Sequence, residues 1–243
     1  MGFFDFFSGS KGGPDKAISK HIKTLTNPYV QHEDRLRAAE LLAQINTDES
    51  LFGLLKRYDI TLDKSYQDMD EKVYAKDLLV SKGQAAVEPI RRYLKSSENV
   101  NWPERILTNI LDDEKAVVDV ILEVLDSIKD SGDMKGAHRK SVISMLKKYQ
   151  DIRIAPLMLP FLHDFDEGVR AEAVEVLDVQ ADPCVREELF QVMTGPDEES
   201  MRVRRRVVEI FVKHQWSVAD WLDTVAGWLP EGVTVLEDKL VEA

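Results

Sequence analysis

The chain has 243 residues, of which 44% are hydrophobic, and its 32 basic and 44 acidic side chains leave a net charge of −12. This length and composition predict one continuous folded array with a large core. The acidic balance argues against a nucleic-acid partner, because binding to phosphates depends on Lys and Arg. A single cysteine excludes an internal disulfide framework and indicates a reducing cytoplasm, and no apolar run reaches the roughly 20 residues of a transmembrane helix.

The first 13 residues differ from the rest of the chain. Phe3, Phe4, Phe6 and Phe7 are followed by the flexible linker SGSKGG, and the basic flank of a signal peptide is missing. Two interpretations stay open. The segment makes a peripheral contact with a membrane surface or a partner, or it packs on the first repeat or is disordered. We treat 1–13 as a flexible Phe-rich N-terminal segment.

From residue 14 onward, helical patterns come in pairs separated by turns. The first pair spans 14–26 and 32–45, with Pro14 placed where a helix start favours proline. The next pairs are expected at 48–58 with 69–82, 84–95 with 100–112, 113–129 with 135–149, 151–162 with 167–180, and 182–193 with 199–215. Side chains that can cap the starts of second helices are Asp68, Asn99, Asp166 and Ser200.

Two stretches interrupt or follow this helical array. The connector 59–68 is long and has a brief alternating pattern. At the other end a closing helix is expected at 217–229, and it contains Trp221 and Trp228. Because the end of a repeat array must shield an otherwise open core, we expect this helix and the tail 230–243 to form a cap. The array itself is predicted to span 14–229.

In each second helix a small or apolar residue is followed four positions later by a larger apolar residue. The larger residue advances by 37, 31, 36, 31 and 34 residues from unit to unit, about 34 on average. This period is typical of stacked helical repeats, in which the pair faces the core. The pairs are Ala38 and Leu42, Ala75 and Leu79, Ile106 and Ile110, Val142 and Leu146, Ala173 and Leu177, and Val207 and Phe211.

These units resemble HEAT repeats of the short bacterial type, the HEAT/PBS-lyase-like repeats, over about 15–229. The likeness is clearest where the family pattern V-R-x-x-A-x-x-x-L is occupied by Val169, Arg170, Ala173 and Leu177. The resemblance implies an all-α fold, a right-handed α-solenoid of about six helix pairs plus a closing helix, with the second helices on the concave side. It also implies binding rather than chemistry.

Acids and arginines recur at a spacing of six residues. In HEAT repeats such pairs typically form a ladder that links neighbouring units, so we expect a structural role for Asp133 with Arg139, Asp164 with Arg170, and Glu198 with Arg204. The arginine-rich run 202–206 lies among acids and is interpreted as a solvated, paired face. Arg205 and Arg206 stay candidates for contact with an acidic ligand group.

No residue pattern supports catalysis or metal binding. The five histidines are spread over separate units, and none forms the i, i+4 pair of a helical metal site. Cys184 has no histidine near it in sequence and is expected to be a small buried residue. We therefore expect no catalytic residue, no metal and no cofactor. HEAT-like bilin lyases and, less favoured by the charge, HEAT-like DNA glycosylases stay as enzymatic alternatives by resemblance.

Helical geometry picks out a candidate binding face. If the recurring apolar pair faces inward, the residue two positions after its first member points away from the core. The residue one position before the first member lies on the same outward side, three positions before that residue. Stacked units would align them into a polar, largely acidic track for a basic or extended peptide. In the opposite interpretation they form an ordinary solvated face with i, i+3 ion pairs. The candidate residues are Arg37, Glu40, Tyr74, Asp77, Arg105, Glu175, Arg206 and Glu209. The predicted function is a non-enzymatic cytoplasmic protein-binding or scaffold module.

Overall fold

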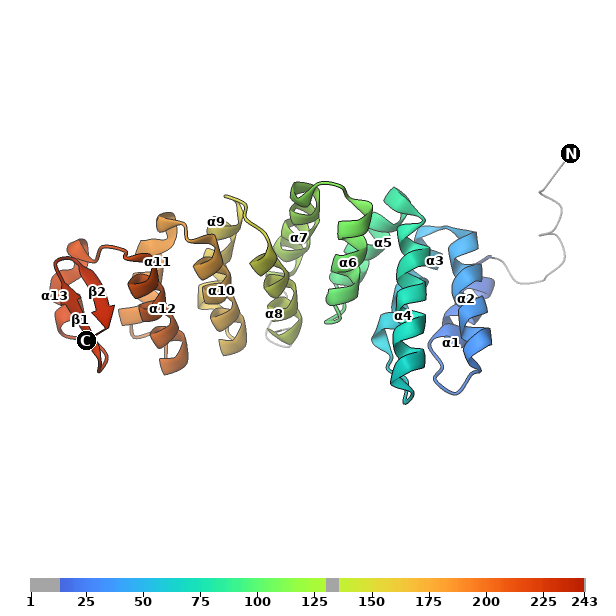
Figure 1. Ribbon diagram of the computed structural model, residues 1–243, viewed down its shortest axis with the longest axis horizontal. Helices are drawn as coiled ribbons and strands as arrows, with labels where there is room; N and C mark the ends of the chain where they lie inside the picture. The colour runs from blue at the N-terminus through green and yellow to red at the C-terminus, as the bar shows by residue number, and fades with distance from the viewer. Residues whose placement is uncertain (1–13, 130–135, 243) are drawn as a thin grey trace, which may run out of the picture. The chain divides into compact units, whose positions relative to one another are not determined.

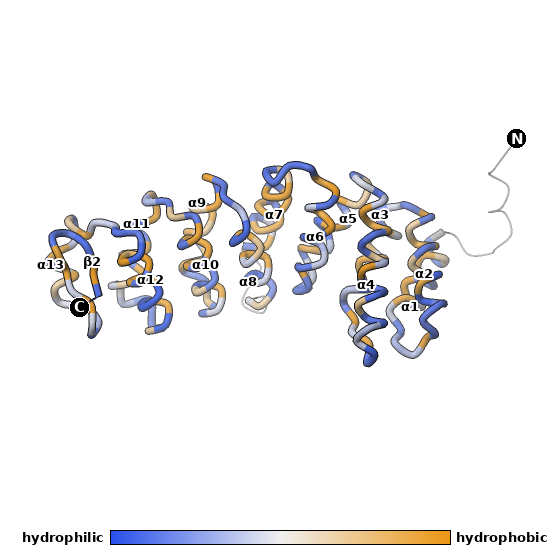
Figure 2. Tube along the Cα trace, viewed as in Figure 1, coloured by the Kyte–Doolittle hydropathy of each residue, from blue (hydrophilic) through white to orange (hydrophobic). Residues whose placement is uncertain are grey.

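The computed structural model describes residues 14–129 and 136–242 (Figure 1). The Phe-rich segment 1–13 lies outside the described residues. The chain divides into two compact units, 1–117 and 118–243, and the boundary falls within α7 (Glu114–Ile128). Along the helices in Figure 2, hydrophobic and hydrophilic residues alternate turn by turn, as expected for helices with one buried side.

Unit 1 is built from two layers of helices. The second helices of the first three pairs, α2 (His32–Ile45), α4 (Ser65–Val80) and α6 (Asn101–Ile110), pack side by side in sequence order. The first helices α1 (Pro14–Leu25), α3 (Asp48–Leu55) and α5 (Val87–Leu94) form the other layer. Short 3₁₀ segments, η2 (Lys56–Asp59) and η3 (Gly83–Ala86), extend this first-helix layer. The helix bounds predicted from the sequence for these three pairs agree with the structure to within a few residues.

Unit 2 repeats the arrangement. Its second helices are α8 (Gly136–Met145), α10 (Glu167–Gln180) and α12 (Met201–His214), with α10 between the other two. After α7, the first helices are shorter and partly 3₁₀: α9 (Ile154–Met158) with η6 (Leu159–His163), and η7 (Pro183–Val185) with α11 (Arg186–Thr194). The segment η5 (Leu146–Lys148) completes α8. Pro160 accounts for the break between α9 and η6, since proline lacks the N–H that an α-helix needs.

Local side-chain chemistry sets several helix ends. Asp166 accepts hydrogen bonds from the backbone N–H groups of Gly168 and Val169, and Ser200 accepts one from Val203, so these two predicted caps are confirmed. The predicted caps Asp68 and Asn99 were wrong. Asp68 lies inside α4 and is buried, and the residue that precedes α6 is Val100, without a side-chain cap.

The recurring apolar pair faces inward as predicted. Eleven of its twelve residues are buried, and Ile110 is half-buried. In α6 the neighbouring Leu107 is fully buried, so the inward side of that helix is rotated by about one residue. Helix pairs stack on one another within each unit, so the predicted all-α helical-repeat fold is confirmed for the described residues. The superhelix over the whole chain stays a prediction.

The C-terminal end contains strands in addition to helices. The closing helix is short, η8 (Ala219–Trp221) followed by α13 (Leu222–Ala226). After it, β1 (Val233–Leu236) and β2 (Lys239–Glu242) form an antiparallel hairpin that packs on α12. Leu240 of β2 is fully buried, and the backbone N–H of Val218 donates to Asp238 O over 2.7 Å. The hairpin thus covers apolar surface at the end of the array.

Candidate functional site

A ladder of buried ion pairs joins the repeats of unit 2. Arg139 Nε donates to Asp164 over 2.7 Å, and Arg170 Nε donates to Glu198 over 2.7 Å. Backbone carbonyl oxygens also accept hydrogen bonds from the arginines of this ladder: Arg170 donates to Asp164 O and Arg204 donates to Glu198 O. The predicted structural role of these arginines is confirmed for the described residues, while Asp133 lies outside them.

A second buried cluster occupies unit 1. Arg57 of η2 is fully buried and donates to Glu71 and Asp68 of α4, over 2.9 and 2.8 Å. Arg35 of α2 also donates to Glu71, with a shortest distance of 2.6 Å. The predicted connector 59–68 is shorter in the structure, because α4 begins at Ser65. Asp68 accepts from the backbone N–H of Leu62, so the cluster holds the connector 60–64 against α4. The residues that hold this connector are therefore structural.

These clusters predict acid sensitivity. In Asp68, Glu71 and Glu198 burial acts to raise the carboxyl pKa, but hydrogen bonds and cations outweigh it, so each folded-state pKa lies below its ordinary value. A lowered folded pKa adds stability above the unfolded pKa, about 4, and that stability is lost as pH falls below it. We expect thermal unfolding midpoints to be steady from pH 7 to 5 and to drop between pH 4.5 and 3. Equal midpoints at pH 7 and 3 would contradict this.

In unit 1 the predicted face lies on α2, α4 and α6. Arg37, Asp77 and Arg105 are exposed, and Glu40 and Tyr74 are half-buried. The Tyr74 hydroxyl donates to Glu40 Oε1 on the neighbouring helix, and this bond with burial raises the pKa of Tyr74 to about 12. The acid at the predicted position thus links two repeats instead of standing free in solvent.

Sequence reasoning missed an apolar part of the same face. Tyr66, Met69 and Val73 of α4 are exposed large hydrophobic residues on the side opposite Ala75 and Leu79. Their spacing of three and four residues places them on one side of the helix. That second apolar stripe was visible in the sequence, but the inward pair already accounted for the buried side of α4.

In unit 2 the predicted residues Glu175, Arg206 and Glu209 come together between α10 and α12. Arg206 Nε donates to Glu175 over 2.8 Å, its Nη2 to Asp178 over 2.6 Å, and its Nη1 to Glu209 over 3.2 Å. These bonds raise the pKa of Arg206, with the bond to Glu175 as the largest cause. Arg206 is therefore a bridge between two repeats, and its predicted i, i+3 contact with Glu209 is one of three.

These residues line a shallow groove of about 470 Å³. Met201, Arg202 and Arg205 of α12 line it as well, and all three are exposed. Arg202 lies 3.7 Å from Glu167, and Arg205 lies 3.5 Å from Glu209, which matches the paired, solvated arginine face expected from the sequence. The groove of unit 2 is thus mixed in charge rather than largely acidic.

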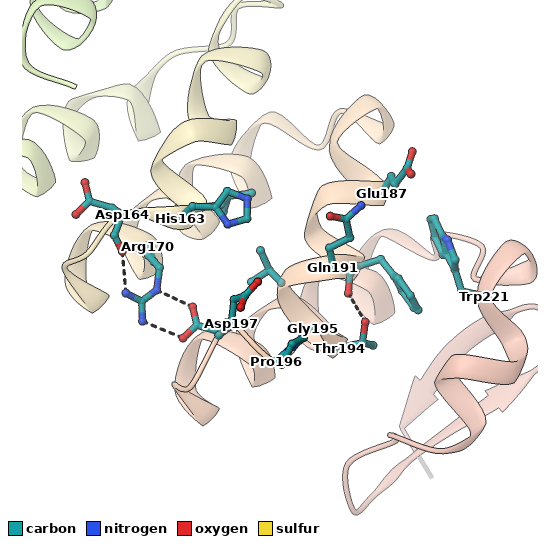
Figure 3. A pocket seen from close by; sticks show the side chains of 14 residues that line it. His163, Asp164, Arg170, Glu187, Gln191, Thr194, Gly195, Pro196, Asp197 and Trp221 are labelled. Carbon is teal, nitrogen blue, oxygen red and sulfur yellow. Dashed lines mark hydrogen bonds and ion pairs between the residues drawn. The ribbon is translucent and has the colours of Figure 1, made fainter. Parts of the chain in front are cut away.

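A second depression in unit 2, of about 450 Å³, lies on the side of the first helices (Figure 3). Phe190 of α11 and Trp221 of η8 stack at 4.3 Å and form an apolar wall. Glu187, Gln191 and Asp197 add polar groups to its lining. The depression therefore combines an apolar wall with polar groups at its edge.

Cys184 is exposed, so the expectation of a buried residue was wrong. Partial burial and the neighbouring Asp182 raise the pKa of its thiol, which leaves it protonated near neutral pH. Within 14–129 and 136–242, no three His, Cys, Asp or Glu side chains are placed to hold a metal ion. The helices in those ranges include none with the length and apolar character to cross a membrane.

No model of a known protein family matches this chain, and no curated protein matches it. Among solved structures, it is similar to a designed armadillo repeat protein in complex with the peptide (KR)4. The sequence identity is 15% and the TM-score 0.39, and the alignment covers 80% of this chain and 99% of the designed protein.

Proposed function

We propose that this chain is a non-enzymatic protein-binding scaffold whose partners contact the exposed faces of its second helices. The observation that carries the proposal is an exposed methionine on one second helix of each unit. Met69 on α4 and Met201 on α12 both stand six residues before the first member of the inward pair, and both are exposed beside charged side chains. Methionine adapts to varied partner surfaces and is frequent at protein-binding sites.

Links between neighbouring repeats support the same proposal. Glu40 and Tyr74 join α2 to α4, and Glu175 and Arg206 join α10 to α12. These bonds preorganise the exposed face within each unit, and binding to a preorganised surface loses less conformational entropy. The partner we propose is a basic or extended protein segment, in the cytoplasm that the single cysteine favours.

Charge reversal tests the proposal. We expect Asp77→Lys combined with Glu209→Lys to lower the recovery of the wild-type partners at least tenfold in quantitative co-purification. Both carboxylates are exposed, so the thermal midpoint should change little. Partner recovery by the wild type should also fall as salt rises, since screening acts over about 8 Å at physiological ionic strength.

The matched control reverses two exposed acids in loops, Glu98→Lys with Glu231→Lys, and should keep the partners. Partners retained by the Asp77 and Glu209 variant would overturn the proposal. Loss of partners only on deletion of 1–13 would assign binding to the Phe-rich segment instead.

A further inference from the structure

The exposed side of α4 has an unusual concentration of apolar surface. Tyr66, Met69 and Val73 have relative exposures of 83%, 54% and 38%. We call these three residues the α4 stripe. At about 1.5 Å per residue, the stripe extends for about 10 Å along the helix. An adjoining depression at the start of α4 is lined by Lys64 and Gln67 and also contains Tyr29, which is 93% exposed.

Contacts within unit 1 leave this stripe uncovered. The opposite side of α4 buries Ala75 and Leu79, and its flanks pack on α2 and α6. Large apolar side chains that gather on one exposed helix face favour a partner that removes them from water, whereas single scattered ones do not. The stripe therefore needs an occupant with apolar residues of its own.

Charge around the stripe indicates the chemistry of that occupant. Asp70 and Asp77 lie on the same side of α4 as Tyr66, four and eleven residues after it, and their side chains are 52% and 62% exposed. Asp70 is 3.6 Å from His32 Nε2, and Asp77 is 2.9 Å from Lys76 Nζ. Two exposed carboxylates beside apolar residues complement cations and repel phosphate or anionic lipid.

We propose that the α4 stripe binds an amphipathic helix of another protein, with apolar residues spaced three and four apart and Lys or Arg beside them. The spacing of the stripe matches that of such a helix, so side chains of the two helices can interdigitate. The carboxylates of Asp70 and Asp77 then face the partner's cations. The inference rests on the proposed function and names the partner class for unit 1.

A phage-displayed library of random 16-residue peptides, selected on the full chain, tests this inference. We expect enriched peptides with apolar residues at helical spacing and interspersed Lys or Arg. For a synthesised, dye-labelled peptide from this set, fluorescence anisotropy should show Kd at least tenfold higher for Met69→Lys with Val73→Lys. The milder double variant Met69→Ser with Val73→Ser should raise Kd severalfold. It should remain folded even if the lysine variant does not fold. Asp70→Asn with Asp77→Asn should reduce the salt dependence of Kd.

The matched control replaces exposed apolar residues of unit 2, Ile152→Lys with Leu236→Lys, and should leave Kd within twofold of wild type. Peptides that bind the stripe variants as tightly as wild type overturn the inference, as does a selection that enriches none. Self-association of the wild type that disappears in the serine variant also overturns it, because the occupant is then a second copy. The proposed function has a separate test. It is overturned if the partners still co-purify with the variant that combines Asp77→Lys and Glu209→Lys.

Discussion

Replacing Glu71 with alanine is expected to lower the free energy of unfolding by about 3–5 kcal/mol, the loss typical of a buried ion pair that loses one partner. Glu71 is almost fully buried and accepts hydrogen bonds from Arg35 and from Arg57, which are also buried. His32 Nδ1 lies 2.7 Å from the same carboxylate. Without Glu71, two guanidinium groups keep their desolvation cost and lose their shared counter-charge.

Urea unfolding of the full chain measures this effect. A suitable control is Glu88→Ala, which removes an exposed carboxylate paired with Arg91 three residues away and should cost less than about 0.5 kcal/mol. A loss below about 1 kcal/mol for Glu71→Ala would mean that water reaches the two arginines when the carboxylate is removed. The cluster would then contribute little to holding the connector 60–64.

Replacing Leu177 with alanine should lower the free energy of unfolding by roughly 2–5 kcal/mol. Leu177 is fully buried in α10, which packs against both α8 and α12 within unit 2. Truncation removes apolar contact and leaves a cavity between repeats, and neighbouring helices fixed by the arginine ladder can close it only in part.

The comparison for this substitution is Glu175→Ala, two residues earlier on the same helix. The Glu175 side chain is 40% exposed and accepts from Arg206, so its loss should cost less than about 1 kcal/mol. Thermal and urea unfolding of both variants would show the contrast. Equal losses at the two positions would mean that the buried side of α10 has been misassigned.

Several features of this fold were predictable from local pattern alone. The recurring apolar pair identified the buried side of the second helices, to within about one residue in α6, because a side chain's direction on a helix follows from its position along it. The caps Asp166 and Ser200 are likewise local properties. A structural role for Arg170 and Glu198 was predictable because acids and arginines recur with the repeat, although Glu198 was paired with Arg204 and its carboxylate binds Arg170.

Partners from different repeats were not predictable in the same way. In the solvated-face interpretation Glu40 pairs with Arg37 on its own helix, whereas in the structure it accepts from Tyr74 on the next one. Asp68 was expected to cap a helix, and it binds the buried Arg57. Arg202 and Arg205 line the groove that the sequence described as acidic.

The physical reason is the same in each case. Periodicity along one helix determines which side is buried, but the charge and apolar character of a binding face depend on side chains about 30 residues apart, from separate helices. Their contacts depend on how each helix is rotated and shifted against its neighbour. The sequence by itself determined the repeat, its helix pairs and their inward sides. Only the tertiary structure decided which polar groups neutralise one another and which surface, above all the α4 stripe, stays exposed.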